Sequence, residues 1–416
     1  MAQAVSLTHS APSAQPAGCP VDHSTYSHQK TAPYPEPAVP AQARDEAGVW
    51  QVRGYAEARQ ILRGAQTKQA GFKAELIERI PVTRSQPILY LEGQAHLTQR
   101  KQTARFFTPT ATSANYRALM QALTDELIGG FQQAGRADLS ALSMRLAVRV
   151  AAQVVGLTDS RRPRMDRRLD AFFRGQPGTV GRTPRAFLRT LRDQWHLLLF
   201  FQLDVKPAIA ARRRQPQADV ISHLLGQNAS DTEILTECIT YGAAGMATTR
   251  EFISAAAWHF LEQPALRARY LAAAEPERHA LLQEILRLEP VIGHLLRRAT
   301  EDVSVISGGE TVTIPAGDLI DLHVYGANAD ESVVGEAPLA ICPGRVLHAD
   351  KVTPAVLSFG DGHHRCPGAF IAIQESDIFL QCLLALPNLR IERLPTLTWN
   401  ELTMGYELRD FRLALD

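Results

Sequence analysis

Apolar residues recur at positions i, i+3 and i+4 from about residue 53 to residue 290 of this chain. This spacing predicts amphipathic helices that pack together through one apolar face. Proline and glycine residues interrupt the pattern and predict where helices end: Pro81, Pro87, Pro163, Pro177, Gly178, Pro184, Pro207 and Pro216. The larger part of the chain is therefore expected to be helical.

The pattern changes between residues 297 and 345. Val303–Ile306 and Thr311–Ile314 alternate apolar and polar residues around Gly308-Gly309, which predicts a β-hairpin. Leu319–Tyr325 predicts a further strand, an apolar run from Ala369 to Leu386 predicts a helix, and residues 387–416 predict short strands. The fold class is therefore mainly α (α+β), with minor β-sheets.

Residues 1–44 differ from the rest of the chain. Residues 1–40 are rich in Ala, Pro, Ser and Gln, so residues 1–44 are interpreted as a mobile or extended N-terminal arm. No linker interrupts residues 45–416, which are expected to form one large domain. We expect no secretory signal peptide and no membrane span, because no run of 18 apolar residues occurs.

The net charge is +1, so no general electrostatic argument favours binding of nucleic acid. Five cysteines, Cys19, Cys238, Cys342, Cys366 and Cys382, are scattered without a CxxC motif. An odd and dispersed set is not typical of a disulfide framework and indicates a reducing compartment. We therefore expect a cytoplasmic protein, and a monomer.

The residues with the clearest chemistry lie in the loop Phe359–Gly368, which reads Phe-Gly-Asp-Gly-His-His-Arg-Cys-Pro-Gly. Cys366 precedes the predicted helix, whose unpaired N–H groups and positive dipole end should lower the thiol pKa. A single thiolate of this kind suits a haem iron with a cysteine axial ligand. Two alternatives are a zinc site with His363 and His364, although adjacent residues rarely complete a tetrahedron, and a buried structural cysteine.

A second informative segment runs from Asp231 to Glu262 without a proline. Its middle, Gly242–Thr249, is rich in small residues that would let a planar group lie against the helix. The Thr248 hydroxyl can bond back to the Ala244 carbonyl and open a local bulge. Close helix–helix packing explains the small residues equally well.

A third segment, Glu284–Arg287, places Glu284 and Arg287 three residues apart on one helix face. Such a pair is commonplace on a protein surface. It becomes informative because a strand region, the turn Pro343-Gly344-Arg345 and the cysteine loop follow it in that order.

Taken together, the three segments resemble the cytochrome P450 haem-thiolate monooxygenases. The shared motifs are Ala-Gly-x-x-Thr-Thr in a long helix, Glu-x-x-Arg, and Phe-Gly-x-Gly-x-His-x-Cys-x-Gly. The resemblance covers roughly residues 45–416 and implies a P450-like fold of the bacterial type without a membrane anchor. It also implies haem b as the cofactor, a hydrophobic small-molecule substrate and a ferredoxin/ferredoxin reductase redox chain as partner.

The resemblance implies a role for each matching residue. Cys366 would be the metal ligand, with Phe359 and Gly368 beside it in the cofactor-binding loop. Thr248, with Gly245 and Thr249, would form the catalytic part of the central helix. Four residues would bind the haem propionates: His96, Arg100, Arg297 and His364. Glu284, Arg287 and Arg345 would form a structural triad.

The chain departs from the family pattern at two positions. Ala247 stands where Asp or Glu usually precedes the threonine, so protons would need water, substrate hydroxyls, Thr249 or Glu251. Pro367 stands where leucine is usual, and removes one possible donor near the sulfur. Three other readings stay open: a peroxide-driven enzyme, a coupling or desaturating oxidase, and a non-catalytic haem protein that senses a ligand.

Overall fold

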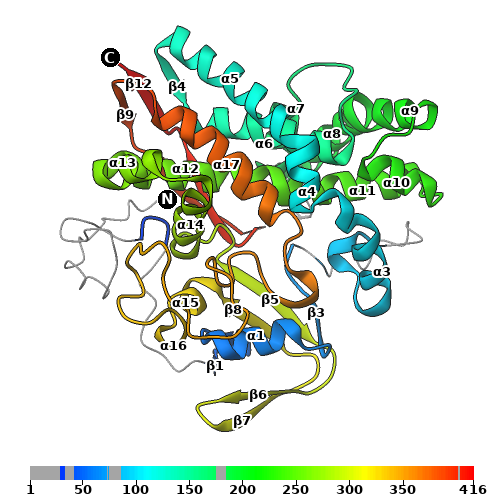
Figure 1. Ribbon diagram of the computed structural model, residues 1–416. Helices are drawn as coiled ribbons and strands as arrows, with labels where there is room; N and C mark the ends of the chain where they lie inside the picture. The colour runs from blue at the N-terminus through cyan, green and yellow to red at the C-terminus, as the bar shows by residue number, and fades with distance from the viewer. Residues whose placement is uncertain (1–28, 33–41, 73, 75–85, 175–183, 402) are drawn as a thin grey trace.

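In the computed structural model, a part rich in β-strands lies below a larger helical part in the view of Figure 1. The structure describes residues 29–32, 42–72, 74, 86–174, 184–401 and 403–416. By the family resemblance, the segments expected to contact substrate are 74–93, 172–187, 241–248, 290–295 and 402–406. Of these, residues 75–85, 175–183 and 402 lie outside the described residues. None of the described helices is long and apolar enough to cross a membrane.

The largest sheet has five strands in the order β1-β2-β8-β5-β3. The β2–β8 pair is parallel, and the other three pairs of neighbouring strands in this sheet are antiparallel. The strands of this sheet are β1 (Gln42–Arg44), β2 (Trp50–Val52), β3 (Thr67–Gln69), β5 (His294–Ala299) and β8 (Leu319–His323).

Helix α1 (Tyr55–Arg63) covers part of this sheet and of the hairpin β6–β7 (Val303–Ser307 and Glu310–Ile314). Tyr55, Ala58, Ile61 and Leu62 form its buried face, at the spacing of an amphipathic helix. A separate apolar core joins this face to the buried side of the hairpin. This core fixes α1, whose C-terminal end lies beside the cysteine loop.

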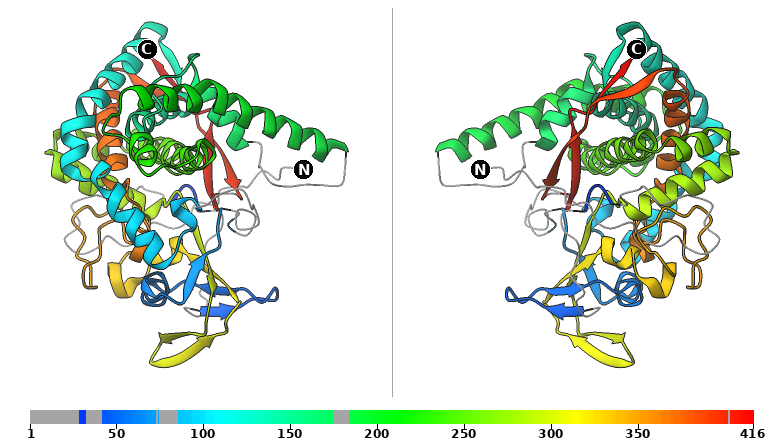
Figure 2. Two further views of the ribbon diagram at one scale, coloured as in Figure 1. Left: turned by 90° about the vertical axis from the view of Figure 1, so that its right-hand side faces the viewer. Right: turned by 90° about the vertical axis from the view of Figure 1, so that its left-hand side faces the viewer.

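Three long helices form the centre of the second, larger core. They are α6 (Leu139–Val155), α12 (Thr248–Glu262) and α17 (Ala369–Leu384). Helix α12 packs against both α6 and α17, and α5 (Arg117–Ala134) packs against the same two helices. Nearly the whole length of α12 is buried, so it runs through the middle of the helical part (Figure 2).

The remaining helical segments are α3 (Gly93–Thr103), α4 (Pro109–Ala111), α7 (Met165–Arg174), α8 (Pro184–Phe200), α9 (Lys206–Arg214), α10 (Val220–Gly226), α11 (Asp231–Gly242), α13 (Pro264–Ala272), α14 (Glu275–Leu288), α15 (Val324–Asn328) and α16 (Glu331–Val334). The shorter 3₁₀ and π segments are η1 (Ile88–Tyr90), η2 (Ala104–Phe106), η3 (Thr112–Tyr116), η4 (Phe201–Val205), η5 (Ala243–Ala247) and η6 (Gly362–His364). The other strands are β4 (Arg136–Asp138), β9 (Leu389–Arg393), β10 (Thr396–Asn400), β11 (Gly405–Arg409) and β12 (Arg412–Leu415).

The architecture confirms the mainly helical α+β class. The hairpin forms with Gly308 and Gly309 at positive φ, which is the conformation that glycine adopts without strain. The strand predicted over Leu319–Tyr325 ends at His323, where α15 begins. The helix predicted after Cys366 and the C-terminal strands are present.

The described residues of the N-terminal segment contact the rest of the protein at two places. Gln42–Arg44 forms the edge strand β1, so a boundary after residue 44 cuts through the large sheet. Lys30 and Thr31 are buried, and both donate backbone N–H groups to the Glu289 carboxylate. These described parts therefore belong to the packed structure.

Candidate functional site

Cys366 lies in a short extended link between the 3₁₀ turn η6 and the first residue of α17. Its own N–H donates to the Phe359 carbonyl at 2.8 Å, which closes the loop. The backbone N–H groups of Gly368 and Ala369 are directed at the sulfur. This arrangement follows from the unpaired N–H groups at a helix start, as the sequence predicted.

Desolvation by the surrounding protein raises the pKa of the Cys366 thiol, although the N–H groups of Gly368 and Ala369 and the charges of Arg100 and Arg365 act in the opposite direction. The N–H groups at the helix start lower the thiol pKa, as the sequence predicted, but desolvation is the larger effect and the net pKa is raised. The sulfur-bearing residue is nevertheless exposed by its own surface area.

The cysteine loop is anchored on the end of α1. Arg59 and Arg63 both bind Asp361, at 3.2 and 2.9 Å, and Asp361 accepts the Gly362 N–H at 2.7 Å. Gly362 has φ +65°, and a Cβ there would lie 2.1 Å from the Leu62 carbonyl oxygen. Only glycine fits so close to the backbone of α1. The sequence motif indicated the glycine but not its partner helix.

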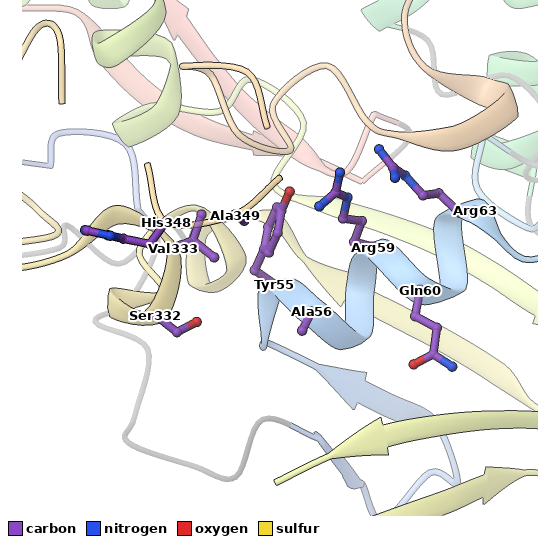
Figure 3. A pocket seen from close by; sticks show the side chains of 9 residues that line it. All are labelled: Tyr55, Ala56, Arg59, Gln60, Arg63, Ser332, Val333, His348 and Ala349. Atoms are coloured by element: carbon purple, nitrogen blue, oxygen red, sulfur yellow. The ribbon is translucent and has the colours of Figure 1, made fainter. Parts of the chain in front are cut away.

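Helix α1 also lines, along its length from Tyr55 to Arg63, an open surface hollow of about 440 Å³, together with Ser332, Val333, His348 and Ala349 (Figure 3). Arg59 and Arg63 border it and also hold Asp361. None of the residues predicted for the catalytic or cofactor-binding site lines this hollow. We therefore assign it no part in the chemistry.

The four residues predicted to bind propionates gather around Glu92. The rings of His96 and His364 stack with centroids 4.1 Å apart, and His364 Nε2 lies 3.0 Å from the Glu92 carboxylate. Arg297 is buried and lies 4.0 Å from Glu92, while Arg100 donates to the Arg365 carbonyl. Elements α3, β5 and the cysteine loop thus bring the four side chains together.

Positive charge and donor groups are in excess at this cluster. Burial, and then the neighbouring His364, lower the pKa of His96 to about 4. The Nε of Arg297 is buried without a hydrogen-bond partner in the described part of the chain. A buried unpaired guanidinium N–H is costly, so the cluster is suited to further carboxylates.

The central helix runs from Asp231 to Glu262, as predicted, but in three parts. The π-helical segment η5 separates α11 from α12, and the Thr248 hydroxyl donates to the Ala244 carbonyl across it. Ala244 is exposed, and Ala247 and Thr248 are partly exposed, whereas Met246 is buried. One side of the bulge is therefore accessible, whereas the other is packed in the core.

Gly245 and Thr249 face other elements. A Cβ on Gly245 would lie 3.7 Å from the Cβ of Ala151, so this side of the residue faces α6 at ordinary contact distance. Thr249 is buried and hydrogen-bonds Glu375 of α17. Burial raises the pKa of Glu375 to about 8, although the bond from Thr249 acts in the opposite direction.

Sequence reasoning did not single out Glu375. One of its carboxylate oxygens is buried without a hydrogen-bond partner in the described residues, as are both amide atoms of the neighbouring Gln374. A pKa near 8 means that the Glu375 carboxyl holds a proton at neutral pH. The only sequence signal was the polar stretch Gln374–Asp377 inside a largely apolar helical run.

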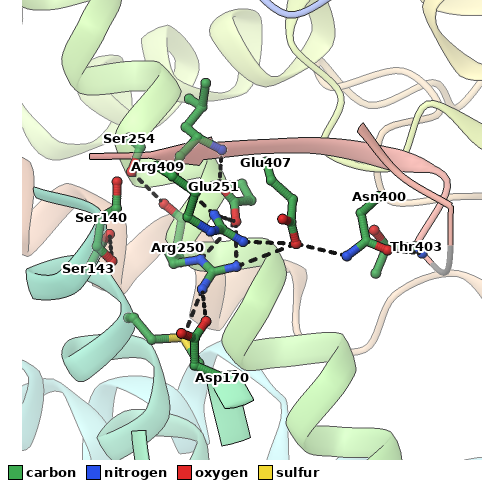
Figure 4. Close-up of polar contacts among 12 residues, drawn as sticks. Ser140, Ser143, Asp170, Arg250, Glu251, Ser254, Asn400, Thr403, Glu407 and Arg409 are labelled. Carbon is green, nitrogen blue, oxygen red and sulfur yellow. Dashed lines mark hydrogen bonds and ion pairs between the residues drawn. The ribbon is translucent and has the colours of Figure 1, made fainter. Parts of the chain in front are cut away.

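Glu251, considered as a proton donor in place of Ala247, is held in a network of charges (Figure 4). It lies 2.7 Å from Arg250 and 2.6 Å from Arg409, and it accepts the Leu408 N–H at 2.7 Å. Arg250 also binds Asp170 at 2.7 Å. A carboxylate with three charged or polar donors is an anchor for β11 and not a free proton donor.

Glu284 accepts bonds from both of its predicted partners. Arg287 binds it through Nε and Nη2, both at 2.9 Å, and Arg345 Nε lies 3.1 Å away. The Cys342 N–H donates to it at 3.0 Å. Desolvation alone would raise the pKa of Glu284, but the two guanidinium groups hold it below its ordinary value.

This triad is connected to the cysteine loop through Asn328. Arg287 and Asn328 exchange hydrogen bonds at 2.8 and 2.9 Å. Asn328 in turn accepts the Leu357 N–H and donates to Ser358, the residue before Phe359. The buried charges therefore support the backbone that leads to Cys366.

The comparisons with known proteins agree with this geometry. Residues 278–394 match the family model described as Cytochrome P450. The chain is 29% identical over 355 residues to cyclomarin C epoxidase CymV of Salinispora arenicola, covering 80% of this chain and 82% of that protein. It is 25% identical over 354 residues to the biotin biosynthesis cytochrome P450 of Bacillus subtilis, covering 82% and 84%.

Solved structures match over most of their length. P450BioI, in complex with an acyl carrier protein ligated with hexadec-9Z-enoic acid, has a TM-score of 0.71 at 23% identity, covering 89% of this chain and 93% of that one. CalO2 has a TM-score of 0.73 at 21% identity, covering 90% and 92%. These likenesses show the P450 fold.

The fold and the cysteine loop define the class of haem-thiolate oxygenases. The chain belongs to the cytochrome P450 family and is a P450 monooxygenase, an oxidoreductase that uses a haem-thiolate cofactor.

Proposed function

We propose that this P450 inserts one oxygen atom of O₂ into an unactivated C–H bond of a hydrophobic small molecule, with two electrons from a ferredoxin/ferredoxin reductase chain. Cys366 carries this proposal. Among the described thiols, that of Cys366 combines N–H groups at a helix start, a nearby cationic cluster and an exposed residue surface. When bound, the haem supplies the oxygen-activating chemistry.

The described residues fit haem b in three respects. Cys366 would hold the iron, with Phe359 and Gly368 shaping the loop around its sulfur. Two propionates would neutralise the excess of donors at His96, Arg100, Arg297 and His364, and would give the unpaired Arg297 Nε a partner. Burial of the charges then costs less, since each acquires a partner.

The substrate class is inferred from the residues of the expected substrate segments. The described parts of the expected substrate segments include apolar residues such as Ile88 and Val291. Structures of one protein of the same fold, CYP109E1 from Bacillus megaterium, hold corticosterone and testosterone, and both ligands are hydrophobic. CymV is named as an epoxidase, so oxygen transfer to a C=C bond is the second candidate reaction.

The experiment that tests the proposed function is a screen of hydrophobic compounds with the purified holoenzyme. We expect a substrate-induced shift of the Soret band for the compounds that bind. Incubation with NADPH, ferredoxin reductase and ferredoxin should then yield a product that carries one ¹⁸O atom from ¹⁸O₂. Haem binding with spectral shifts but without any product would instead support a haem sensor.

Proton supply is the part of the mechanism in which this chain differs from its family. Ala247 cannot carry a proton, and Glu251 is held by Arg250 and Arg409. The Thr248 hydroxyl lies at the open side of the bulge and could bind water there. Glu375 holds a proton at neutral pH and bonds Thr249, so we propose it as the buried proton source behind the central helix.

Thr248→Ala is expected to uncouple reductant use from product formation. Removing the hydroxyl removes the polar group at the open side of η5, so protons would no longer be delivered in step with electrons. The measurement is peroxide released per NADPH consumed, which should rise several-fold. Glu375→Gln should raise it in the same direction, because an amide cannot release the proton.

The matched control for this prediction is Thr236→Ala. Thr236 makes the same kind of bond to the carbonyl four residues back, at 2.7 Å, but lies in α11 away from the bulge. The Thr236→Ala protein should release as much peroxide per NADPH as the wild type does. Unchanged coupling in Thr248→Ala would remove the threonine from the relay and strengthen the peroxide-driven reading.

We propose Arg365, Lys101 and Arg105 as the docking surface for an acidic ferredoxin. All three side chains are exposed, and the bond from Arg100 to the Arg365 carbonyl holds α3 against the cysteine loop. We also propose that the protein is cytoplasmic, because its five cysteines are dispersed without a CxxC motif.

Arg365→Glu is expected to slow reduction by ferredoxin about tenfold at low salt, because a like charge opposes encounter. Stopped-flow reduction of the haem measures this rate, and turnover supported by peroxide checks that the haem site is intact. Arg393→Glu, an equal charge change at an exposed position of β9, should leave the rate unchanged. Equal loss of both activities in Arg365→Glu would place Arg365 in the haem site and not in docking.

A further inference from the structure

Strands β5 and β8 place two histidines opposite each other. His294 pairs with His323 in the antiparallel register, and Leu296 pairs with Asp321. Because side chains alternate along a strand, His294, Asp321 and His323 share one face of the sheet. Leu295 and Arg297 lie on the other face, so this group is separate from the propionate cluster.

The three side chains converge at that face. His294 Nδ1 lies 2.9 Å from Oδ1 and 3.0 Å from Oδ2 of Asp321, and His323 Nε2 lies 3.9 Å from Oδ2. The two imidazole rings are 4.6 Å apart between centroids. One nitrogen from each histidine and one carboxylate oxygen all lie within 4.8 Å of one another.

A fourth group comes from the neighbouring strand β2. Gln51 pairs with Asp321 in the parallel register, and its Oε1 lies 2.5 Å from His323 Nε2. The exposed fractions of the His294, Asp321 and His323 side chains are 19, 12 and 10%. The group is thus mostly enclosed but can be reached from solvent.

We propose that His294, Asp321 and His323 bind one divalent transition-metal ion of the zinc type, at a site distinct from the haem. Two imidazole nitrogens and one carboxylate oxygen are a common ligand set for Zn²⁺, and the distances among them require only small side-chain rotations to face one ion. The Gln51 carbonyl oxygen or a water molecule would complete a tetrahedron.

The chemistry of these ligands favours zinc over calcium or magnesium. Ca²⁺ and Mg²⁺ take oxygen ligands almost exclusively, whereas neutral imidazole suits Zn²⁺, Cu²⁺ and Ni²⁺. The carboxylate provides the negative charge that a cation needs in a largely buried place. It also bonds His294, so the site keeps its polar groups paired when no ion is bound.

The ion would connect two strands directly. β5 carries Arg297 of the propionate cluster, and β8 lies between β5 and β2 at the centre of the large sheet. A cation held by both strands would fix their register close to the haem site. The effect is on stability and not on the oxygen chemistry, so the two can be measured separately.

The test uses tag-free holoenzyme that has first been treated with EDTA. The protein is then dialysed against micromolar Zn²⁺ in the presence of millimolar Ca²⁺ and Mg²⁺. Inductively coupled plasma mass spectrometry then measures the zinc and iron contents of the same sample. We expect one zinc per haem iron, and a rise in melting temperature on adding Zn²⁺. Asp321→Asn and His323→Gln should each lower the zinc affinity at least tenfold.

His348→Gln serves as the control, because His348 is exposed and lies outside the group. It should bind zinc as the wild type does. The haem content of each variant shows whether it has folded. Absence of stoichiometric zinc in the wild type, or equal binding in the wild type, Asp321→Asn and His323→Gln, would overturn the proposal.

Discussion

Glu284→Ala should lower the free energy of unfolding by roughly 3–5 kcal/mol, because it leaves two buried guanidinium groups without their carboxylate. Arg287 is 0% exposed and Arg345 6%, so water cannot replace the lost partner. The loss should reach Cys366 through Asn328 and Ser358, which connect the triad to the loop. We therefore expect poor soluble expression and little bound haem.

The measurements are haem per protein and the midpoint of urea unfolding. Glu277→Ala is the matched control on the same helix, since Glu277 forms only a part-exposed pair with Arg269 and should contribute little to stability. A Glu284→Ala protein that is stable, haem-replete and merely slower in turnover would contradict the structural role of the triad.

Cys366→Ser is expected to abolish NADPH-dependent product formation. Serine preserves the size of the side chain and its place before the N–H groups of Gly368 and Ala369, but it cannot supply the thiolate whose electron donation favours O–O cleavage. Product formation should fall below detection even if the variant retains haem. Reverse-phase separation of products from a fixed amount of haem gives the measurement.

The control is Cys382→Ser, which changes a partly buried cysteine on helix α17, the helix that follows Cys366. It should retain both the haem and the activity. Comparable turnover in Cys366→Ser and the wild type would show that another residue holds the iron.

Much of the fold could be read from local sequence. The hairpin at Gly308-Gly309 and the helix after Cys366 depend on residues that are close in the chain, and both are present. The π segment η5 follows from a single short-range bond, that of Thr248 to Ala244. Local patterns of this kind need no knowledge of the tertiary structure.

The supports of the site could not be predicted in this way. Asp361 is held by Arg59 and Arg63, which lie about three hundred positions earlier in the chain, and Glu92 meets His364 across a similar separation. Such pairs exist only once α1, α3 and the cysteine loop are packed together. No local pattern distinguishes Asp361 or Glu92 from an ordinary surface carboxylate.

The pKa shifts of the buried groups could not be predicted from the sequence either. The position of Cys366 at a helix start predicted a lowered pKa, whereas burial raises it. Glu375 differs from other glutamates only because α12 and α17 enclose it, which raises its pKa to about 8. Both effects depend on desolvation, which is a property of the packed structure.

The most direct test of the central claim, that Cys366 binds a haem iron as thiolate, is the absorption spectrum of the reduced carbonyl complex of the wild-type protein. Thiolate ligation predicts the strongly red-shifted Soret band of this family, and Cys366→Ser should lack it while Cys382→Ser keeps it. A wild-type Soret band at the position given by a nitrogen or neutral ligand would contradict the claim, as would an unchanged red-shifted band in Cys366→Ser.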